Sequence, residues 1–270
     1  MKPDGLKDKV AVVTGGASGI GLAVCREFAA HGAGVAILDM DREALGKIAK
    51  AFSAKGIPVL ALPCDITQEE SCKVAMDEVL NTFGRIDILF NNAGTTQRGL
   101  FEKIDIQVFK KVMDVNFFGS LYCTKAALPA LIRGKGVIIV NESIAGVAPL
   151  LGRTGYSASK HALHGMFTSL RCELRHKGVQ VMIVCPGFIR TNLQTRALGC
   201  DGKIAAHEQP RVGTEDTPEN VARQILEGIE KRKTMLVLTF MGKLGYLVSR
   251  LSPGLYERLM TRQFKKELDA

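Results

Sequence analysis

Three side chains between positions 143 and 160 have the types and the spacing to share one proton. Ser143 closes an apolar stretch, and Tyr156 and Lys160 are four residues apart. A helix that begins near Arg153 or Thr154 would present Tyr156 and Lys160 on one face. An ammonium beside a phenol favours the phenolate, so we expect Lys160 to lower the pKa of Tyr156 from about 10 toward neutrality. Tyr156 would then serve as a general base or acid near pH 7; a buried tyrosine beside a solvated lysine is the alternative.

An apolar strand pattern at 10–13 runs into T-G-G-A-S-G-I-G at 14–21 and then into a helical pattern. Free backbone N–H groups and the positive end of a helix suit a pyrophosphate at such a turn. Gly15 would permit the turn, Gly19 the close approach of a phosphate, and Gly21 the packing of the helix on the sheet. The pattern therefore predicts a nucleotide site.

Two carboxylates follow the next two expected strands. Asp39 comes after residues 34–38, about 20 residues beyond the glycine turn, where a dinucleotide fold places an acid on the ribose. A carboxylate there repels a 2′-phosphate and favours NAD over NADP. Arg42 could reach a phosphate, and a plain turn aspartate is the alternative, so NADP stays open. Asp65, after residues 58–62, either contacts the adenine or helps to cap the helix that follows Thr67.

Apolar strand patterns alternate with helical patterns through most of the chain. Strands are expected at 10–13, 34–38, 58–62, within 85–94, and at 136–140, 179–184 and 235–239, with helices between them. This alternation predicts an α/β fold, a Rossmann-like doubly wound parallel sheet of about seven strands with helices on both faces. We expect one domain over 1–240, and over 241–270 a helical tail that belongs to the same domain.

Asn116 lies inside the helical pattern of residues 105–133. Asparagine is unfavourable there because its amide competes for backbone groups. Either a local helix distortion holds a water near Lys160, or the side chain faces solvent.

The helix expected at 153–176 has an apolar stripe, only part of which should pack in the core. Its remainder, with helix 105–133, would suit a subunit interface, so we expect a homodimer or homotetramer.

The composition narrows the classes of function. The net charge of +9 is spread along the chain without an aromatic-basic motif, which argues against nucleic acid. Anionic cofactors, acidic carrier proteins or membrane surfaces explain the charge at least as well. The seven cysteines lack metal-ligand spacing and are expected to be reduced core thiols of a cytoplasmic protein. His161 and His164 have no carboxylate at ligand spacing, so we expect a surface or interface role and no metal. The start has no signal-peptide pattern, and the longest apolar stretch, 235–248, is too short and too interrupted to span a bilayer.

Taken in order, these motifs resemble those of the short-chain dehydrogenase/reductase family over about 7–238 of the chain. The matching features are T-G-x-x-x-G-I-G at 14–21, N-N-A-G at 91–94, Asn116, Ser143, Y-x-x-x-K at 156–160 and P-G at 186–187. The resemblance implies a catalytic tetrad of Asn116, Ser143, Tyr156 and Lys160. In it, Tyr156 exchanges a proton with the substrate oxygen while hydride passes between substrate and nicotinamide. Lys160 also holds the nicotinamide ribose, Ser143 orients the substrate oxygen, and Asn116 supports a proton relay through water.

The same resemblance implies a dinucleotide cofactor. The positions expected to bind it are Gly15, Ser18, Gly19, Ile20, Gly21, Asp39, Asp65, Ile66, Asn92, Ala93, Gly94, Tyr156, Lys160, Pro186, Gly187, Ile189 and Thr191. Met40 follows Asp39 where NADP-preferring members commonly have a basic residue. This agrees with NAD as the preferred cofactor.

Two features depart from the family pattern. Glu142 precedes Ser143, where the family usually has a small residue. Strand alternation points Glu142 away from Ser143, so we expect it either to be paired or to alter the site's charge. The second feature is the tail, whose apolar stripe among arginines and lysines resembles the tails of members that handle steroids, retinoids or other lipid-like alcohols. It would roof an apolar pocket or pack on a partner subunit, and contact with a membrane surface is the other reading. The polar segment 193–217 is expected to be a substrate lid.

These observations favour an NAD(H)-preferring oxidoreductase that interconverts a secondary alcohol and a ketone on an apolar substrate. The first alternative is an NADPH-dependent 3-oxoacyl-carrier-protein reductase, which the positive charge would suit and which Asp39 and the apolar tail oppose. The second is a non-catalytic nucleotide-binding scaffold.

Overall fold

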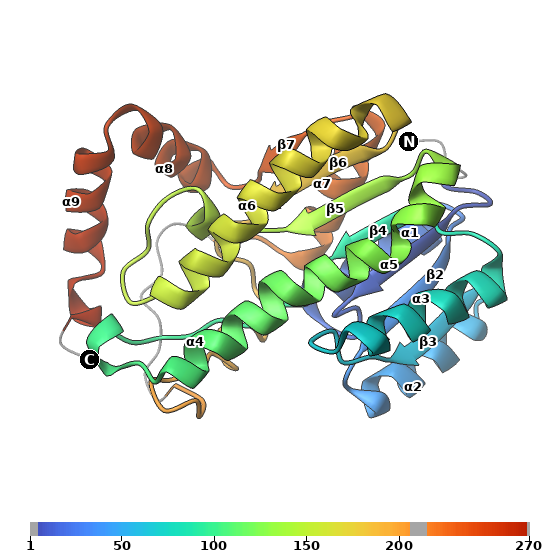
Figure 1. Cartoon of the computed structure of the whole chain (residues 1–270), viewed down its shortest axis with the longest axis horizontal. Helices are drawn as coiled ribbons and strands as arrows, with labels where there is room; N and C mark the ends of the chain where they lie inside the picture. Colours follow the sequence, from blue (N-terminus) through green and yellow to red (C-terminus); the bar gives the residue numbers. More distant parts are fainter. Residues whose placement is uncertain (1–4, 206–214, 269–270) are drawn as a thin grey trace.

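The computed structural model describes residues 5–205 and 215–268 of the chain. Within them, seven parallel strands form one sheet in the order β3-β2-β1-β4-β5-β6-β7. Figure 1 shows the strands, which are β1 (Val10–Thr14), β2 (Gly34–Asp39), β3 (Val59–Pro63), β4 (Ile88–Asn91), β5 (Val137–Asn141), β6 (Gln180–Cys185) and β7 (Met235–Val237). The strand order reverses between β1 and β4, as in a doubly wound fold, and the predicted fold class is confirmed.

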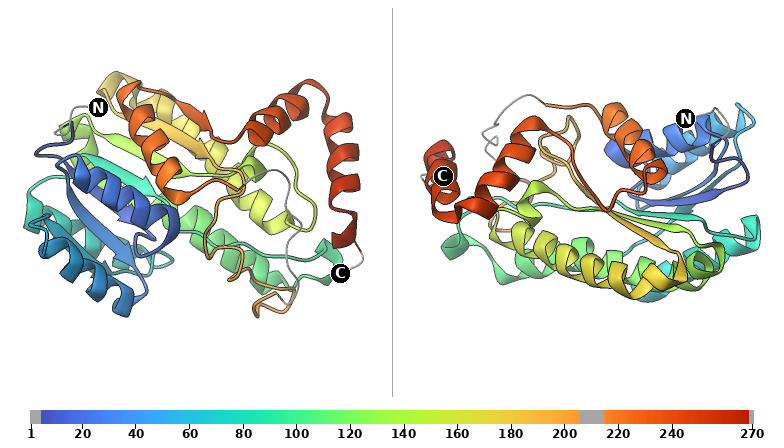
Figure 2. Two further views of the ribbon diagram at one scale, coloured as in Figure 1. Left: turned by 180° about the vertical axis from the view of Figure 1, so that it is seen from behind. Right: turned by 90° about the horizontal axis from the view of Figure 1, so that it is seen from above.

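Helices cover both faces of the sheet (Figure 2). One face carries α1 (Gly19–Ala30), α2 (Arg42–Ser53) and α7 (Pro218–Glu230), and the other carries α3 (Glu69–Phe83), α5 (Gly119–Gly134) and α6 (Thr154–Leu174). On the first face Phe28 and Ile225 are fully buried against the sheet, and on the second Phe167 and Leu131 are. The sheet is therefore buried on both sides, which explains why its strands have nearly continuous apolar sequences.

Polar side chains define several helix starts. The Thr217 hydroxyl accepts from the Asn220 N–H at 3.2 Å, with Pro218 in the first turn of α7 as predicted. Thr239 caps α8 (Phe240–Leu251) in the same way, accepting from the Gly242 N–H at 3.0 Å. Because Thr239 starts this helix, β7 ends at Val237, two residues before the end that we expected.

The long helical region around Asn116 is not one regular helix. It consists of α4 (Ile106–Met113), a π-helical turn (Asp114–Phe118) and α5. Asn116 lies in the π-helical turn and is completely buried. The expected local distortion is thus confirmed and the solvent-facing alternative is wrong, while the water near Lys160 stays a prediction. A π-helical turn releases a backbone carbonyl from the regular hydrogen-bond pattern. Here the Ser120 hydroxyl donates to the backbone carbonyl of Asn116 at 2.8 Å.

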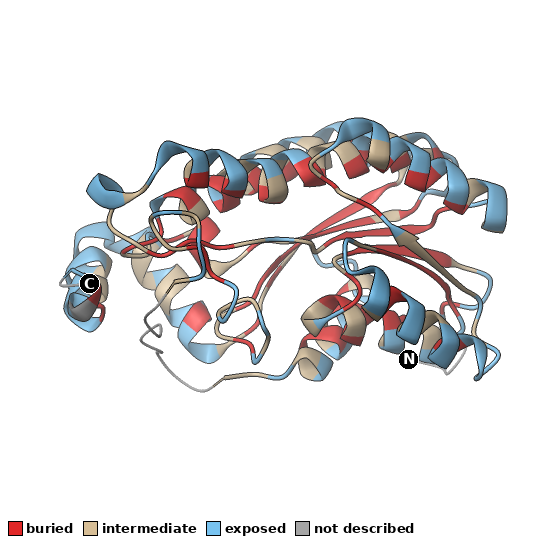
Figure 3. Ribbon diagram, turned by 90° about the horizontal axis from the view of Figure 1, so that it is seen from below, coloured by how far each residue is buried: buried red, intermediate tan, exposed pale blue. Residues whose placement is uncertain are grey.

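The tail forms two helices at one end of the molecule, α8 and α9 (Pro253–Gln263), which Ser252 separates (Figure 1). A short 3-10 turn, Lys265–Glu267, follows. Much of the tail surface is exposed (Figure 3), including Leu247 and Leu251. In the part of the chain that the structure describes, we find no helix with the length and apolar character of a membrane span. Residues 206–214 of the expected lid lie outside the described residues.

Candidate active site

A cavity of about 1210 Å³ lies at the carboxyl ends of the strands, between the sheet and the tail. The expected site residues that line it are Gly15, Ser18, Gly19, Ile20, Asp39, Asp65, Ile66, Asn92, Ala93, Gly94, Ser143, Tyr156, Lys160, Pro186, Gly187, Ile189 and Thr191. Gly21 and Asn116 are not part of its lining. This edge of an open parallel sheet is the usual ligand crevice. The structure thus brings the expected cofactor and catalytic residues to one space.

The glycine turn has the backbone shape of an anion site. Gly15 and Gly19 have φ values of +62° and +52°, which larger residues rarely adopt. A Cβ on Gly21 would overlap the Gly15 carbonyl oxygen and lie 2.6 Å from Nδ2 of Asn92. The Asn92 amide also donates to that carbonyl at 3.1 Å, which fixes the turn. Ser18 makes no side-chain hydrogen bond to the start of α1. These groups fit the pyrophosphate of a dinucleotide.

The two strand-end carboxylates differ in their surroundings. Asp39 accepts from the Ala17 N–H of the glycine turn at 3.0 Å and from the Asp41 N–H at 3.1 Å, and it lines the cavity. Asp65 accepts from the N–H and the hydroxyl of Thr67 at 3.0 and 2.8 Å. Asp65 therefore orders the turn before α3. Since it also lines the cavity, its contact with an adenine stays a prediction.

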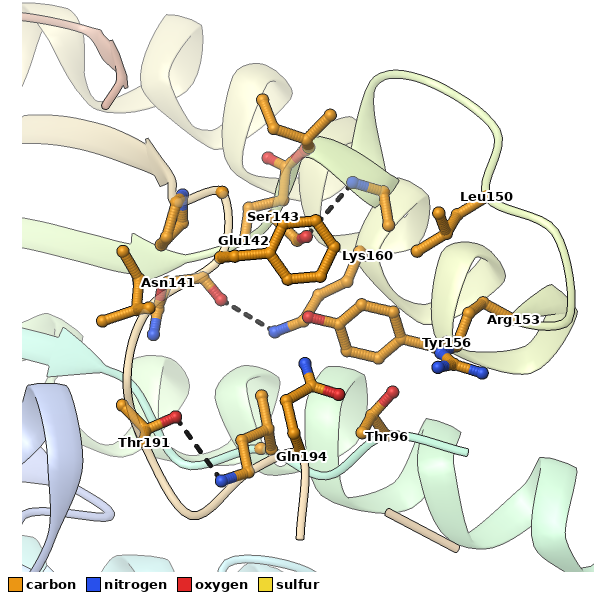
Figure 4. A pocket seen from close by; sticks show the side chains of 18 of the residues that line it. Thr96, Asn141, Glu142, Ser143, Leu150, Arg153, Tyr156, Lys160, Thr191 and Gln194 are labelled. Carbon is orange, nitrogen blue, oxygen red and sulfur yellow. Dashed lines mark hydrogen bonds between the residues drawn. The ribbon is translucent and has the colours of Figure 1, made fainter. Parts of the chain in front are cut away.

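Figure 4 shows Ser143, Tyr156 and Lys160 gathered in the wall of the cavity. Tyr156 and Lys160 lie one turn apart on α6, as the spacing predicts. The Lys160 ammonium donates to the Asn141 carbonyl at 2.8 Å and lies 5.6 Å from the centre of the Tyr156 ring. The end of β5 thus positions both Ser143 and the Lys160 head group.

The expected lowering of the Tyr156 pKa is wrong for this structure. Burial raises the pKa of Tyr156, although a hydrogen bond with Ser143 opposes the rise. Burial also lowers the pKa of Lys160 to about 8. Both changes follow from desolvation, which disfavours the phenolate and the ammonium alike. The sequence shows the spacing of the two groups but not how deeply they are buried.

Asn116 links the π-helical turn to α6 and to the loop after β4. Its Oδ1 accepts from the Thr95 N–H at 2.8 Å, and its Nδ2 donates to the Thr95 carbonyl at 3.0 Å and to the Ser159 hydroxyl at 2.8 Å. A Cβ on Gly94 would lie 3.1 Å from Oδ1 of Asn116 and 3.7 Å from Nζ of Lys160. A larger residue than Gly94 would therefore crowd Asn116, and Gly94 keeps this part of the cavity wall low.

Gln97 is a site residue that the sequence did not reveal. It is fully buried, and its Oε1 accepts from the Tyr156 N–H at 2.8 Å. Ser159 adds a second contact to the backbone of Tyr156, since its hydroxyl donates to the Tyr156 carbonyl at 2.7 Å. Gln97 lies in a loop 59 positions before Tyr156, and no local pattern signals such a contact.

Glu142 is paired, which was one of our two expectations for it. Its carboxylate is completely buried and lies 3.2 Å from Nδ1 of His164. Glu142 follows β5 and reaches His164 from a distant sequence position, while His164 is half-buried and His161 is exposed, so their surface or interface role stays a prediction. Among the described residues, no group of three histidine, cysteine or acidic side chains could hold a metal ion. The cysteines are free, but Cys172 is exposed and Cys200 is half-buried, so these two are not core thiols.

The tail forms one wall of the cavity. Its lining side chains include Met241, Leu244, Val248, Leu259, Met260 and Phe264. The Arg153 guanidinium, just before α6, lies 3.9 Å from the carboxylate of Glu267, and both side chains are 2% exposed. Phe264 is also buried. The tail therefore covers the part of the cavity beyond Tyr156, while its outer side remains exposed.

The sequence profile of the family described as short chain dehydrogenase matches residues 9–198. The chain belongs to the short-chain dehydrogenase/reductase family. It is 35% identical to the bovine (Bos taurus) dehydrogenase/reductase SDR family member 7B over 97% of this chain and 83% of the relative. A short-chain dehydrogenase from Streptomyces avermitilis has 30% identity and a TM-score of 0.78 over 96% of this chain and 98% of its own. A 7α-hydroxysteroid dehydrogenase complexed with NADH and 7-oxo glycochenodeoxycholic acid has 25% identity and a TM-score of 0.75, over 86% and 92%.

Membership in this family makes the chain an NAD(P)-dependent oxidoreductase. The family profile ends at residue 198, before α7 and the tail. The profile therefore includes the glycine turn, Asp39 and the tetrad positions, but not the tail segments that line the rest of the cavity.

Proposed function

We propose that the protein is an NAD(H)-preferring oxidoreductase that interconverts a secondary alcohol and a ketone on an apolar substrate, with Tyr156 as the acid and base. The observation that carries this proposal is the meeting of Ser143, Tyr156 and Lys160 in a cavity whose remaining wall is largely apolar. Such a cavity combines a proton donor with a surface that a steroid-like, retinoid-like or long-chain molecule would bury.

The bound nicotinamide would accept or supply the hydride. The chain's own residues handle the proton and the orientation of the substrate. The Tyr156 phenolate receives the proton of the alcohol oxygen in oxidation, and the Tyr156 hydroxyl so formed donates it to the ketone oxygen in reduction. The Ser143 hydroxyl lies with Tyr156 in the wall of the cavity and is placed to bind the same oxygen. Lys160 lines the cavity beside Gly94, where it is placed to bind a ribose, and the buried Asn116 behind Gly94 would support a proton relay through water.

The preference for NAD rests on Asp39. Its carboxylate lines the cavity and is held by the backbone of the glycine turn, where an adenosine ribose would lie. A 2′-phosphate would meet this negative charge. Met40, the next residue, is 68% exposed and offers no positive charge to compensate.

The apolar character of the substrate rests on the far part of the cavity. Its lining there combines Ile144, Ala148, Leu150, Phe188 and Leu193 with the apolar tail residues. Transfer of an apolar molecule into such a site is favourable by about 25 cal/mol per Å² of apolar surface removed from water. Substrates with extended apolar frameworks should therefore bind more tightly than short alcohols.

Replacement of Tyr156 by Phe tests the chemistry. The variant removes only the hydroxyl, so we expect turnover of apolar ketones to fall by about a hundredfold or more while NADH still binds. The measurement combines steady-state turnover with a titration of NADH fluorescence. Turnover close to that of the wild type would contradict the role of Tyr156, and loss of NADH binding would show that the variant disturbs the site itself. The homo-oligomeric assembly, the cytoplasmic location and peripheral membrane contact through the tail stay predictions.

A further inference from the structure

The carboxylate of Glu142 has unusual surroundings for a charged group. Its side chain is completely buried, one oxygen contacts His164, and the other has no hydrogen-bond partner among the described residues. Burying an ionised carboxylate is costly unless nearby charges or hydrogen bonds compensate. Such a residue, directly before Ser143, is unexpected if β5 only needs to pack, because a small side chain would avoid the cost.

The chain makes room for this carboxylate. A Cβ on Gly146 would overlap Oε1 of Glu142 and lie 2.7 Å from its Cδ and Cγ. Gly146 ends the short turn that follows Ser143. The turn therefore packs directly on the Glu142 side chain, which fixes the carboxylate in place from one side while His164 holds it from the other.

Helix α6 places the catalytic lysine beside this carboxylate. Lys160 and His164 are one helical turn apart and share a face of α6. The charged and titratable groups that act on Glu142 are His164, Lys160 and His161 of α6. Cys185 of β6, Tyr156 and Arg171 in turn sense its charge. Burial raises the pKa of Glu142, and His164 opposes that rise, so His164 supports the ionised form.

A negative charge on Glu142 raises the pKa of both catalytic groups, Lys160 and Tyr156. It raises the pKa of Lys160 against the effect of burial, and it adds to the rise in the pKa of Tyr156. Lys160 therefore keeps its ammonium, and Tyr156 keeps its proton, to a higher pH than they would beside a neutral residue. A protonated tyrosine is the form that donates to a ketone oxygen.

We propose that Glu142, held by His164, is a positioning residue that preserves the Lys160 ammonium at neutral pH, extends to higher pH the range in which Tyr156 carries its proton, and so adapts this site to the reduction of a ketone. The inference rests on the proposed function, in which Tyr156 is the proton donor. It adds the direction of the reaction to which the site is suited, and it gives a role to a residue that departs from the family pattern.

The test compares Glu142→Gln with the wild type. This change removes the charge and keeps the shape of the side chain. The pH dependence of kcat/KM should shift to lower pH by about one unit for both ketone reduction and alcohol oxidation, which is the order of effect expected for one neighbouring charge in a protein. Glu173→Gln is the matched control, because it removes an exposed carboxylate from the same helix and should leave both profiles unchanged.

A spectroscopic measurement tests the same point without turnover. The absorbance of the Tyr156 phenolate, taken as the difference between each protein and its Tyr156→Phe counterpart, should appear at lower pH in the Glu142→Gln protein. His164→Gln should shift the profile in the same direction but less, since the carboxylate would then take up a proton more readily. In the Glu142→Gln background, His164→Gln should add no further shift.

Unchanged pH profiles and an unchanged phenolate titration in Glu142→Gln would overturn the inference, even if turnover or the melting temperature falls. If Glu142→Gln does not fold, the Glu142→Ser and Gly146→Ala double variant allows the same comparison, because the alanine methyl group occupies space that the shorter side chain leaves. Full activity of Tyr156→Phe would instead refute the proposed function. The two failures are therefore distinguishable.

Discussion

The selectivity for NAD should depend on the charge of Asp39, and replacement by Asn removes that charge with little change in shape. Hydrogen bonds that involve a charged group contribute about 1.5–3 kcal/mol, which corresponds to a factor of roughly 10 to 150 in affinity. Asn keeps one acceptor oxygen and can still accept from the Ala17 N–H, which the carboxylate binds at 3.0 Å. We therefore expect the ratio of NADPH to NADH affinity to rise by at least about tenfold in Asp39→Asn, through weaker NADH binding and relief of repulsion on NADPH.

The assay is a titration of each variant with NADH and NADPH, followed by the fluorescence of the reduced nicotinamide. Asp41→Asn is the matched control. That aspartate is the N-cap of α2, with its Oδ1 accepting from the Ala44 N–H at 3.0 Å, and it does not line the cavity. It should affect stability and leave the affinity ratio unchanged. An unchanged ratio in Asp39→Asn would mean that Asp39 serves only the glycine turn and does not contact the ribose.

Two further predictions concern buried charges. Burial favours a higher pKa for Asp87, but hydrogen bonds from Arg85 at 2.7 Å and from the Val10 N–H at 2.9 Å hold it below its usual value. A depressed pKa stabilises the fold above the unfolded pKa of about 4. Asp87→Asn should therefore lower the free energy of unfolding by about 2–3 kcal/mol at pH 7. In urea-induced unfolding, this difference from the wild type should shrink as the pH falls below about 4. A difference that does not change with pH would show that the charge of Asp87 does not stabilise the fold. Glu267→Gln leaves the buried Arg153, whose pKa burial lowers to about 10, without its carboxylate partner. The KM for apolar ketones should therefore rise severalfold while the affinity for NADH is unchanged. An equal loss of NADH affinity would argue against a role limited to the substrate.

Most of the fold could be predicted because its signals are local. The strands are short buried apolar runs, and each begins and ends within two or three residues of the position that the pattern indicated. A local distortion at Asn116 was one of two alternatives that the sequence offered, since an asparagine inside an apolar helical pattern needs a compensating partner or solvent. The structure supplies that partner in Thr95 and Ser159.

The site was predictable only where its residues belong to contiguous motifs. The contact of Gln97 with the Tyr156 N–H and that of Glu142 with His164 join segments that the sequence separates by 59 and 22 positions. The pKa of Tyr156 could not be predicted for another reason. Spacing gave the sign of the interaction with Lys160, but desolvation opposes it, and its size depends on burial.

Three long-range contacts around the site meet on one element, α6. Gln97 binds the backbone of α6 at Tyr156, Arg153 connects the start of α6 to the tail through Glu267, and Glu142 contacts the middle of α6 at His164. None of these contacts changes the identity of a tetrad residue. Each changes what surrounds α6, the helix that carries Tyr156 and Lys160. Because an acid and base is tuned by its environment, the individual chemistry of this protein should be sought in the contacts of α6 and not in the tetrad alone.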